Sequence, residues 1–288
     1  MANERKTVIV TDSSCDLSDE QLQRCGIRMI SLRVVCQNAE YRDRVDITEE
    51  ELYALLEREL PKTSLPLPED VTSLYEQIKA EGATDVIHLS ISSGLSGTFN
   101  MVRMITEEIQ GDMRVHMVDS KTLSTGLGMM VLAAARALED GATPEEAVAC
   151  ALNVRKRQLG MFIIRTLEFL RKGGRIGRVE GVVGSLLNIK PIIYVNDEGV
   201  YETLAKARGY RSAVDTMMSE AKRFFGNTRM ELSVVHGQAR ADAEALLERL
   251  KSELNVAEGA FVSPVSPVLA IHTGPGLLGV VGNKVDAP

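Results

Sequence analysis

The first half of the sequence alternates short runs of β-branched and aliphatic residues with segments that have a helical pattern. The runs cover residues 6–11, 85–91 and 114–118, and each is followed by a polar turn and a helix-forming segment. This alternation is typical of βαβ units and a parallel sheet. The residues that follow the strands should then gather at one edge of the sheet, where ligands bind in open α/β folds. These residues are Asp12–Ser14, Ser92–Ser96 and Asp119–Ser120.

Three pairs of residues predict where helices begin, because a hydroxyl three positions before Gln or Glu forms a capping box. The pairs are Ser18 with Gln21, Thr48 with Glu51, and Thr143 with Glu146. Between these signals, residues 27–35 have the composition of another strand, and three prolines within residues 61–68 predict an extended loop.

The second half has a different pattern of short strands and two longer helices. Helices are expected at about 210–225 and 239–254, and Asp197-Glu198-Gly199 predicts a hairpin turn. Six short runs predict strands: 161–166, 191–196, 200–206, 230–236, 260–263 and 268–272. We therefore expect an N-terminal parallel-sheet α/β domain at residues 1–160 and a C-terminal α+β domain with a mixed or antiparallel sheet at 161–288. The length of 288 residues agrees with two domains.

The net charge of −7 argues against a nucleic-acid partner, which requires a basic surface. The four cysteines form no C-x-x-C pair and follow no signal peptide, so we expect reduced thiols and a cytoplasmic protein. No apolar run approaches the roughly 18 residues of a transmembrane helix. Any contact with a membrane would therefore be transient.

The segment Ile91-Ser92-Ser93-Gly94-Leu95-Ser96-Gly97-Thr98, here called the serine loop, follows a predicted strand and opens a helix. Backbone N–H groups and hydroxyls at a helix start suit an anion, although Ser93 could simply cap the helix. The loop lacks the last glycine of the G-x-S-x-G nucleophile motif. It also lacks the lysine of a phosphate-binding P-loop.

Two further loops carry polar groups. Lys62-Thr63-Ser64-Leu65-Pro66 places hydroxyls beside proline, where they can donate to a ligand or belong to a simple turn. Residues 167–177 combine adjacent glycines with Arg171, Lys172 and Arg175, which indicates either a basic binding turn or a solvated loop.

His272 stands at the end of the predicted strand 268–272, beside the turn Gly274-Pro275-Gly276, a position from which a side chain can reach a ligand. The other histidines lie within predicted strands, and no pair has metal-ligand spacing. We therefore expect no metal site and no cofactor.

In this order, these segments resemble the DegV family along nearly the whole chain. The matching motifs are V-T-D-S-S-C-D-L, the T-S-x-P loop, I-S-S-G-L-S-G-T, V-D-S-K, L-E-F-L-R-K-G-G-R-I-G, G-S-L-L-N-I-K-P-I-I at 184–193, K-x-R-G at 206–209, and H-T-G-P-G. The resemblance implies one long-chain fatty acid, such as palmitate, stearate or oleate, held in a buried tunnel between two domains. It also implies a partner, fatty acid kinase, that phosphorylates the exposed carboxylate to an acyl phosphate.

The resemblance further implies a role for individual residues. Thr63 and the Ser93/Ser96 loop would bind the carboxylate, with His272 nearby, and spacing does not decide which serine makes the contact. Arg175, Lys206, Arg208 and Arg211 would dock the kinase. The chain would then be a carrier with no catalytic residue of its own. Two other functions stay open: a serine-dependent acyl hydrolase using Ser93 or Ser96 with His272, and a lipid-responsive sensor.

Overall fold

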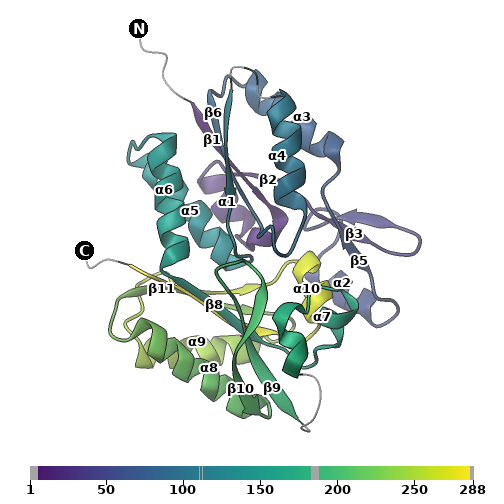
Figure 1. Cartoon of the computed structure of the whole chain (residues 1–288), viewed down its shortest axis with the longest axis vertical. Coiled ribbons are helices and arrows are strands. Elements are labelled where there is room, and N and C mark those ends of the chain that lie inside the picture. Colours follow the sequence, from purple (N-terminus) through teal and green to yellow (C-terminus); the bar gives the residue numbers. More distant parts are fainter. Residues whose placement is uncertain (1–5, 110, 112, 183–187, 286–288) are drawn as a thin grey trace.

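The structure is a computed structural model that describes residues 6–109, 111, 113–182 and 188–285. It contains a four-stranded sheet built from the first half of the chain and a six-stranded sheet built from the second half (Figure 1). A small three-stranded sheet lies beside them. The protein thus has the α/β architecture that the sequence predicts. The first four residues of the motif at 184–193 lie outside the described ranges.

The four-stranded sheet is parallel throughout, in the order β2-β1-β6-β7. Its strands are β1 (Thr7–Asp12), β2 (Arg28–Ile30), β6 (Asp85–Ser90) and β7 (Arg114–Asp119). All six residues of β6 are buried, because helices cover both faces of the sheet. The strands end beside one another, which confirms the prediction that their polar ends share one edge.

Two groups of helices enclose this sheet. The α3 and α4 helices contribute Val71, Tyr75 and Val102 to an apolar cluster with one face, while α1, α5 and α6 pack on the other. The bounds are α1 Asp19–Arg24, α3 Pro68–Ala80, α4 Thr98–Ile109, α5 Thr125–Glu139 and α6 Pro144–Lys156. The three predicted capping boxes are all present, at α1, α2 (Glu49–Leu56) and α6.

The six-stranded sheet has the order β10-β9-β8-β13-β11-β12 and is mixed, because only β11 and β12 run parallel. The strands are β8 (Gln158–Ile163), β9 (Ile189–Val195), β10 (Tyr201–Arg208), β11 (Met230–His236), β12 (Phe261–Pro264) and β13 (Leu278–Lys284). The predicted hairpin between β9 and β10 is confirmed, whereas β13 has no counterpart among the predicted strands. Helices α8 (Tyr210–Phe225) and α9 (Arg240–Glu253) cover one face.

The predicted single strand at 27–35 is wrong. Its residues divide between β2 in the parallel sheet and β3 (Arg33–Val35) in the three-stranded sheet β4-β3-β5. Within the predicted loop 61–68, residues Lys62–Ser64 form β5, which pairs antiparallel with β3; β4 is Glu40–Arg42. Such short strands depend on pairing partners, so local composition predicts them poorly.

The predicted strand 268–272 is also wrong, because these residues lie in helix α10 (Pro267–Thr273). Pro267 occupies the first turn, where proline favours a helix. Every residue of α10 is buried, so the apolar run carries no amphipathic pattern, and periodicity alone cannot distinguish such a helix from a buried strand.

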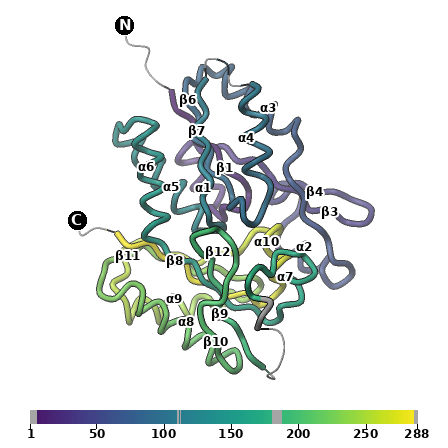
Figure 2. Tube along the Cα trace, viewed as in Figure 1, coloured from purple at the N-terminus to yellow at the C-terminus, as the bar shows by residue number. Residues whose placement is uncertain are grey.

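The second face of the six-stranded sheet turns toward the first half of the chain. Phe162, Ile193 and Val235 pack there with α10 and with residues of β3 and α2 in one apolar cluster. Figure 2 shows α10, α2 and α7 (Glu168–Lys172) close together at the junction of the two sheets. Residue 160 lies within β8, and the division into domains at that point stays a prediction.

Candidate functional site

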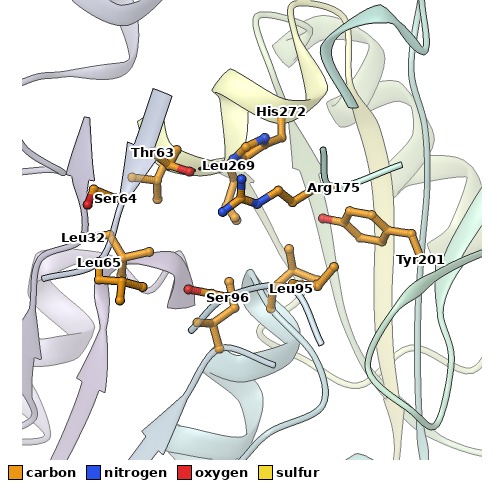
Figure 3. Close-up of a pocket in the computed structure, with 13 residues that line it drawn as sticks. Leu32, Thr63, Ser64, Leu65, Leu95, Ser96, Arg175, Tyr201, Leu269 and His272 are labelled. Carbon is orange, nitrogen blue, oxygen red and sulfur yellow. Dashed lines mark hydrogen bonds between the residues drawn. The ribbon is translucent and has the colours of Figure 1, made fainter. Parts of the chain in front are cut away.

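A cavity of about 190 Å³ lies at this junction (Figure 3). Segments from both halves of the chain form its walls, among them β5, the serine loop, the turn after α7, the start of β10, and α10. Its polar lining residues are Thr63, Ser64, Ser96, Arg175, Tyr201 and His272. Its apolar lining residues are Leu32, Leu65, Ile91, Leu95, Leu123, Val268 and Leu269. Among the described residues that line it, none is acidic.

Thr63 and His272 meet in this cavity although 209 positions separate them. The Oγ1 atom of Thr63 lies 2.9 Å from Nε2 of His272. The structure therefore brings together two residues that the sequence predicted to share a site. The pairing of β5 with β3 fixes Thr63, and helix α10 fixes His272.

His272 is neutral in the folded protein. Burial of the imidazole and the nearby charge of Arg175 lower the pKa of His272 to about 3. The backbone of Gly173 packs against Nδ1 so closely that a Cβ atom at this position would overlap the ring. His272 can consequently donate or accept one hydrogen bond at Nε2 without adding charge to the cavity.

Arg175 carries the only formal charge among the described cavity-lining residues. Its Nη1 atom donates to the carbonyl oxygen of Gly173 at 2.9 Å, and its guanidinium extends toward Thr63 and His272 (Figure 3). A guanidinium here, with neutral His272 and hydroxyl groups around it, favours an anionic ligand.

Asp12, at the end of β1, fixes the start of the serine loop through hydrogen bonds. One carboxylate oxygen of Asp12 accepts hydrogen bonds from Ser90 Oγ at 3.0 Å and Ile91 N at 2.7 Å. The other accepts from Ser14. Asp12 is fully buried, and burial raises its pKa. This carboxylate therefore fixes the point at which β6 turns into the loop.

The two candidate serines have different surroundings. Ser96 lines the cavity, and its Oγ lies 2.8 Å from Oγ1 of Thr98 at the start of α4. Ser93 does not line the cavity, because its Oγ accepts a hydrogen bond of 2.9 Å from Nζ of Lys121. Lys121 also pairs with Asp119 at 2.7 Å.

Ser93 instead lines an outer cavity of about 320 Å³. This cavity shares Leu95, Ser96, Arg175 and Tyr201 with the first, and glycines 94, 97, 174 and 177 form much of its remaining wall. A ligand group held by Ser96 and Arg175 would therefore be reachable from this outer side.

The predicted docking residues do not cluster around Arg175. Lys206 and Arg208 are exposed on β10, and Arg211 is exposed on α8. Tyr201 is the residue of β10 that lines the cavity. Lys206 lies five residues further along the strand, roughly 16 Å away at about 3.3 Å per residue. Arg211 lines a separate surface pocket with Arg165 and Arg249. The docking role stays a prediction.

Sequence reasoning placed Arg175 only at a docking surface and did not identify Tyr201 or the leucines as lining residues. Leu65 and Leu95 lie inside the sequence motifs that indicated the site, so their positions in the sequence could have identified them as lining residues. Tyr201 stands at the start of a strand with no distinguishing neighbours, so only the packing of β10 identifies it.

A hydrolase would need a serine oxygen within hydrogen-bond distance of His272. In the part of the chain that the structure describes, the hydrogen-bond partner of His272 Nε2 is Thr63, not a serine. Across the same residues, no group of three or more His, Cys, Asp or Glu is arranged to hold a metal ion. No described helix is long and apolar enough to span a membrane.

Residues 6–284 match a family described as "Uncharacterised protein, DegV family". A DegV domain-containing protein of Clostridium acetobutylicum is 37% identical over 276 residues, which cover 96% of this chain and 98% of that protein. The resemblance seen in the sequence motifs is therefore confirmed.

Solved structures with the same fold include proteins named for their ligand. A DegV family protein of Thermus thermophilus, named for fatty acid binding, has a TM-score of 0.91 and 34% identity, and the alignment covers 97% of this chain and 100% of that one. A stearic acid-binding protein of Eubacterium ventriosum has a TM-score of 0.88 and 27% identity, covering 96% and 97% of the two chains.

Proposed function

The chain belongs to the DegV family, and from this premise we propose that it binds one long-chain fatty acid and presents the carboxylate to a fatty acid kinase. The observation that carries the proposal is the meeting of Thr63, His272 and Arg175 in one cavity whose other walls are largely aliphatic. The fatty acids bound by its relatives support the ligand class.

The carboxylate would lie between the guanidinium of Arg175 and the hydroxyls of Thr63 and Ser96. When Nε2 of His272 carries the ring proton, it donates to Thr63, and the Thr63 hydroxyl is free to donate to the ligand. A carboxylate accepts from all of these groups at once. An alcohol or an ester would satisfy fewer of them, so the polar end selects the ionised acid.

The acyl chain would supply most of the affinity. Burial of each methylene contributes about 0.8 kcal/mol, so a palmitoyl chain gains roughly 12 kcal/mol, whereas each hydrogen bond to the carboxylate adds about 1.5–3 kcal/mol. The cavity of about 190 Å³ is smaller than the roughly 300–1,000 Å³ of a typical ligand pocket. The chain would therefore enter by separating side chains of the apolar cluster around α10, forming a tunnel.

The kinase would approach the carboxylate from the outer cavity, which Ser93 and the glycines line. Arg175, Lys206, Arg208 and Arg211 are the proposed docking residues, since charges at the rim of an interface steer association and fix orientation. His272 Nε2 is hydrogen-bonded to Thr63 and not to a serine, which favours a carrier over a serine-dependent hydrolase.

The ligand can be identified by mass spectrometry of lipid extracted from the purified protein. We expect about one fatty acid per chain, because a site this favourable fills in a cell that contains lipid. Calorimetry with the delipidated protein should then show binding of palmitate, stearate or oleate and weak binding of palmityl alcohol. Protein that carries no lipid and binds none of the three acids would overturn the proposal.

The kinase role needs a separate assay. Acyl phosphate formation by a fatty acid kinase should require this protein loaded with fatty acid. Binding of fatty acid without any support of acyl phosphate formation would leave a carrier or lipid-responsive sensor and remove the kinase partner.

A further inference from the structure

Helix α10 begins against two buried carboxylates from the other half of the chain. Its N-cap residue, Ser266, makes no side-chain capping bond. Instead, Ser266 N donates to Oδ1 of Asp16 at 2.9 Å, and Val268 N donates to Oδ1 of Asp43 at 3.1 Å. Pro267 has no N–H, so the two carboxylates accept the first two N–H groups at this helix start, those of the N-cap Ser266 and of Val268.

Asp43 connects two walls of the cavity. Its carboxylate holds Val268, and its backbone N–H donates to the carbonyl oxygen of Leu32 at 2.9 Å. Both Leu32 and Val268 line the cavity. The side chain of Asp43 is fully buried, so its bond to Val268 is shielded from water.

Asp16 supports the same connection from a neighbouring position. Its Oδ2 atom accepts a hydrogen bond of 2.5 Å from Ser124 Oγ, and its carbonyl oxygen accepts one of 3.2 Å from Ser263 Oγ. Ser124 directly follows Leu123, another lining residue. Asp16 thereby joins the segment before α5 to the segment before α10.

We propose that Asp43, supported by Asp16, is a positioning residue for the lipid site: it holds α10 against Leu32, so that Val268, Leu269 and His272 close over the ligand. This role rests on the proposed function, because it concerns retention of a fatty acid in the cavity. Weakening of the bond between Asp43 and Val268 should loosen α10 and speed ligand release.

The strength of the hydrogen bond between Asp43 and Val268 should depend on pH, because the two buried carboxylates change protonation state near neutral pH. Burial raises the pKa of Asp43 to about 7; hydrogen bonds from Ser13 and Val268 oppose the rise, as does the charge of Arg44, while Asp16 adds to it. Burial likewise raises the pKa of Asp16 to about 6, again opposed by Arg44. Glu49 on α2 is the nearby acid whose pKa Asp16 helps to raise. On α10, His272 stays neutral, because its pKa is about 3.

Ionised Asp43 accepts a charge-assisted hydrogen bond from Val268, which is about twice as strong as a neutral one. Below pH 7 the bond becomes neutral and weaker. The carboxylate of a fatty acid, with a pKa near that of Glu at about 4.3, stays ionised above pH 6. Release should therefore quicken between pH 8.5 and 6 through Asp43 and Asp16 and not through the ligand.

The test measures the release rate of a fluorescent long-chain fatty acid, displaced by excess oleate, at pH 8.5 and pH 6. Wild-type protein should release it about five to ten times faster at pH 6. Asp43→Asn, which keeps an acceptor oxygen and the side-chain shape, should release it rapidly at both values. The matched control is Asp85→Asn, a fully buried carboxylate at the start of β6 that pairs with His116 and not with α10.

An Asp43→Asn protein that releases the ligand as slowly as the wild type at pH 8.5 would overturn the positioning role, and a wild-type rate that is equal at the two pH values would overturn its dependence on pH. Should Asp43→Asn fail to fold, Asp16→Asn decides, because it weakens the hydrogen bond to Ser266 at the same helix start; release as slow as in the wild type would then overturn the role. Wild-type protein that takes up no fatty acid at either pH would overturn the proposed function itself, which is a distinguishable result.

Discussion

The hydroxyl of Ser92 donates a hydrogen bond of 2.7 Å to the carbonyl oxygen of Gly199, 107 positions away. Ser92 belongs to the serine loop, and Gly199 to the turn between β9 and β10. The hairpin of the second half is thereby fixed to the serine loop of the first half. The same hairpin positions Tyr201, a residue of the cavity wall.

Gly199→Ala should weaken this contact. Gly199 has a φ of +80°, which an alanine adopts only with strain, and a Cβ atom would overlap Ser92 Oγ. We expect a loss of about 1–3 kcal/mol in the free energy of unfolding, measured by urea denaturation, and weaker fatty acid binding. The control is Gly141→Ala, where φ is +87° and nothing lies within 4 Å. Equal losses in the two variants would show that backbone strain alone acts at Gly199.

Thr63→Val removes the hydroxyl and retains the shape of the side chain. Affinity for palmitate should fall about tenfold, because one hydrogen bond to a charged group is lost. Affinity for palmityl alcohol should change much less. Calorimetry on delipidated protein checks both, with Ser73→Ala as the control, since Ser73 is an exposed hydroxyl on α3 away from the cavity. Equal loss for acid and alcohol would indicate a change in the shape of the cavity.

Arg175→Met tests whether this guanidinium serves the ligand, as its place in the cavity indicates, or only a docking surface. We expect fatty acid affinity to fall about tenfold or more, because a charge-assisted contact disappears. Arg208→Met, on the exposed part of β10, should leave affinity unchanged and slow kinase-dependent acyl phosphate formation. Unchanged lipid binding in Arg175→Met would leave Arg175 with the docking role alone.

His88 should make stability depend on pH at a site away from the ligand. It is fully buried against Tyr75, whose hydroxyl lies 2.8 Å from Nδ1, and burial lowers the pKa of His88 to about 3. The unfolded chain binds this proton at about pH 6.5. The contribution of neutral His88 is therefore complete above pH 6.5 and is lost as the pH falls toward 3.

His88→Gln should reduce the slope of unfolding free energy against pH by about 1.4 kcal/mol per unit between pH 6 and 4. Denaturant titrations of both proteins across this range measure the difference. The comparison isolates His88, because Asp16, Asp43 and His272 are common to both. Parallel curves would mean that His88 becomes charged inside the folded protein.

The sequence by itself determined the elements that depend on neighbouring residues. The capping boxes at Ser18, Thr48 and Thr143 begin helices in the structure, because a cap requires residues only three positions apart. The parallel strands and the turn at Asp197–Gly199 follow from local composition in the same way. The motifs also singled out Thr63, Ser96 and His272, which line one cavity in the structure, and their role in binding stays a prediction.

Tertiary structure decided what depends on distant partners. The run at 268–272 became a helix because α10 is buried on all sides and its first N–H groups find Asp16 and Asp43, more than 220 positions earlier. Arg175 reaches into the cavity, while Ser93 is held by Lys121. Hydrogen bonds and burial between remote segments select these orientations, and no local pattern of residues encodes them.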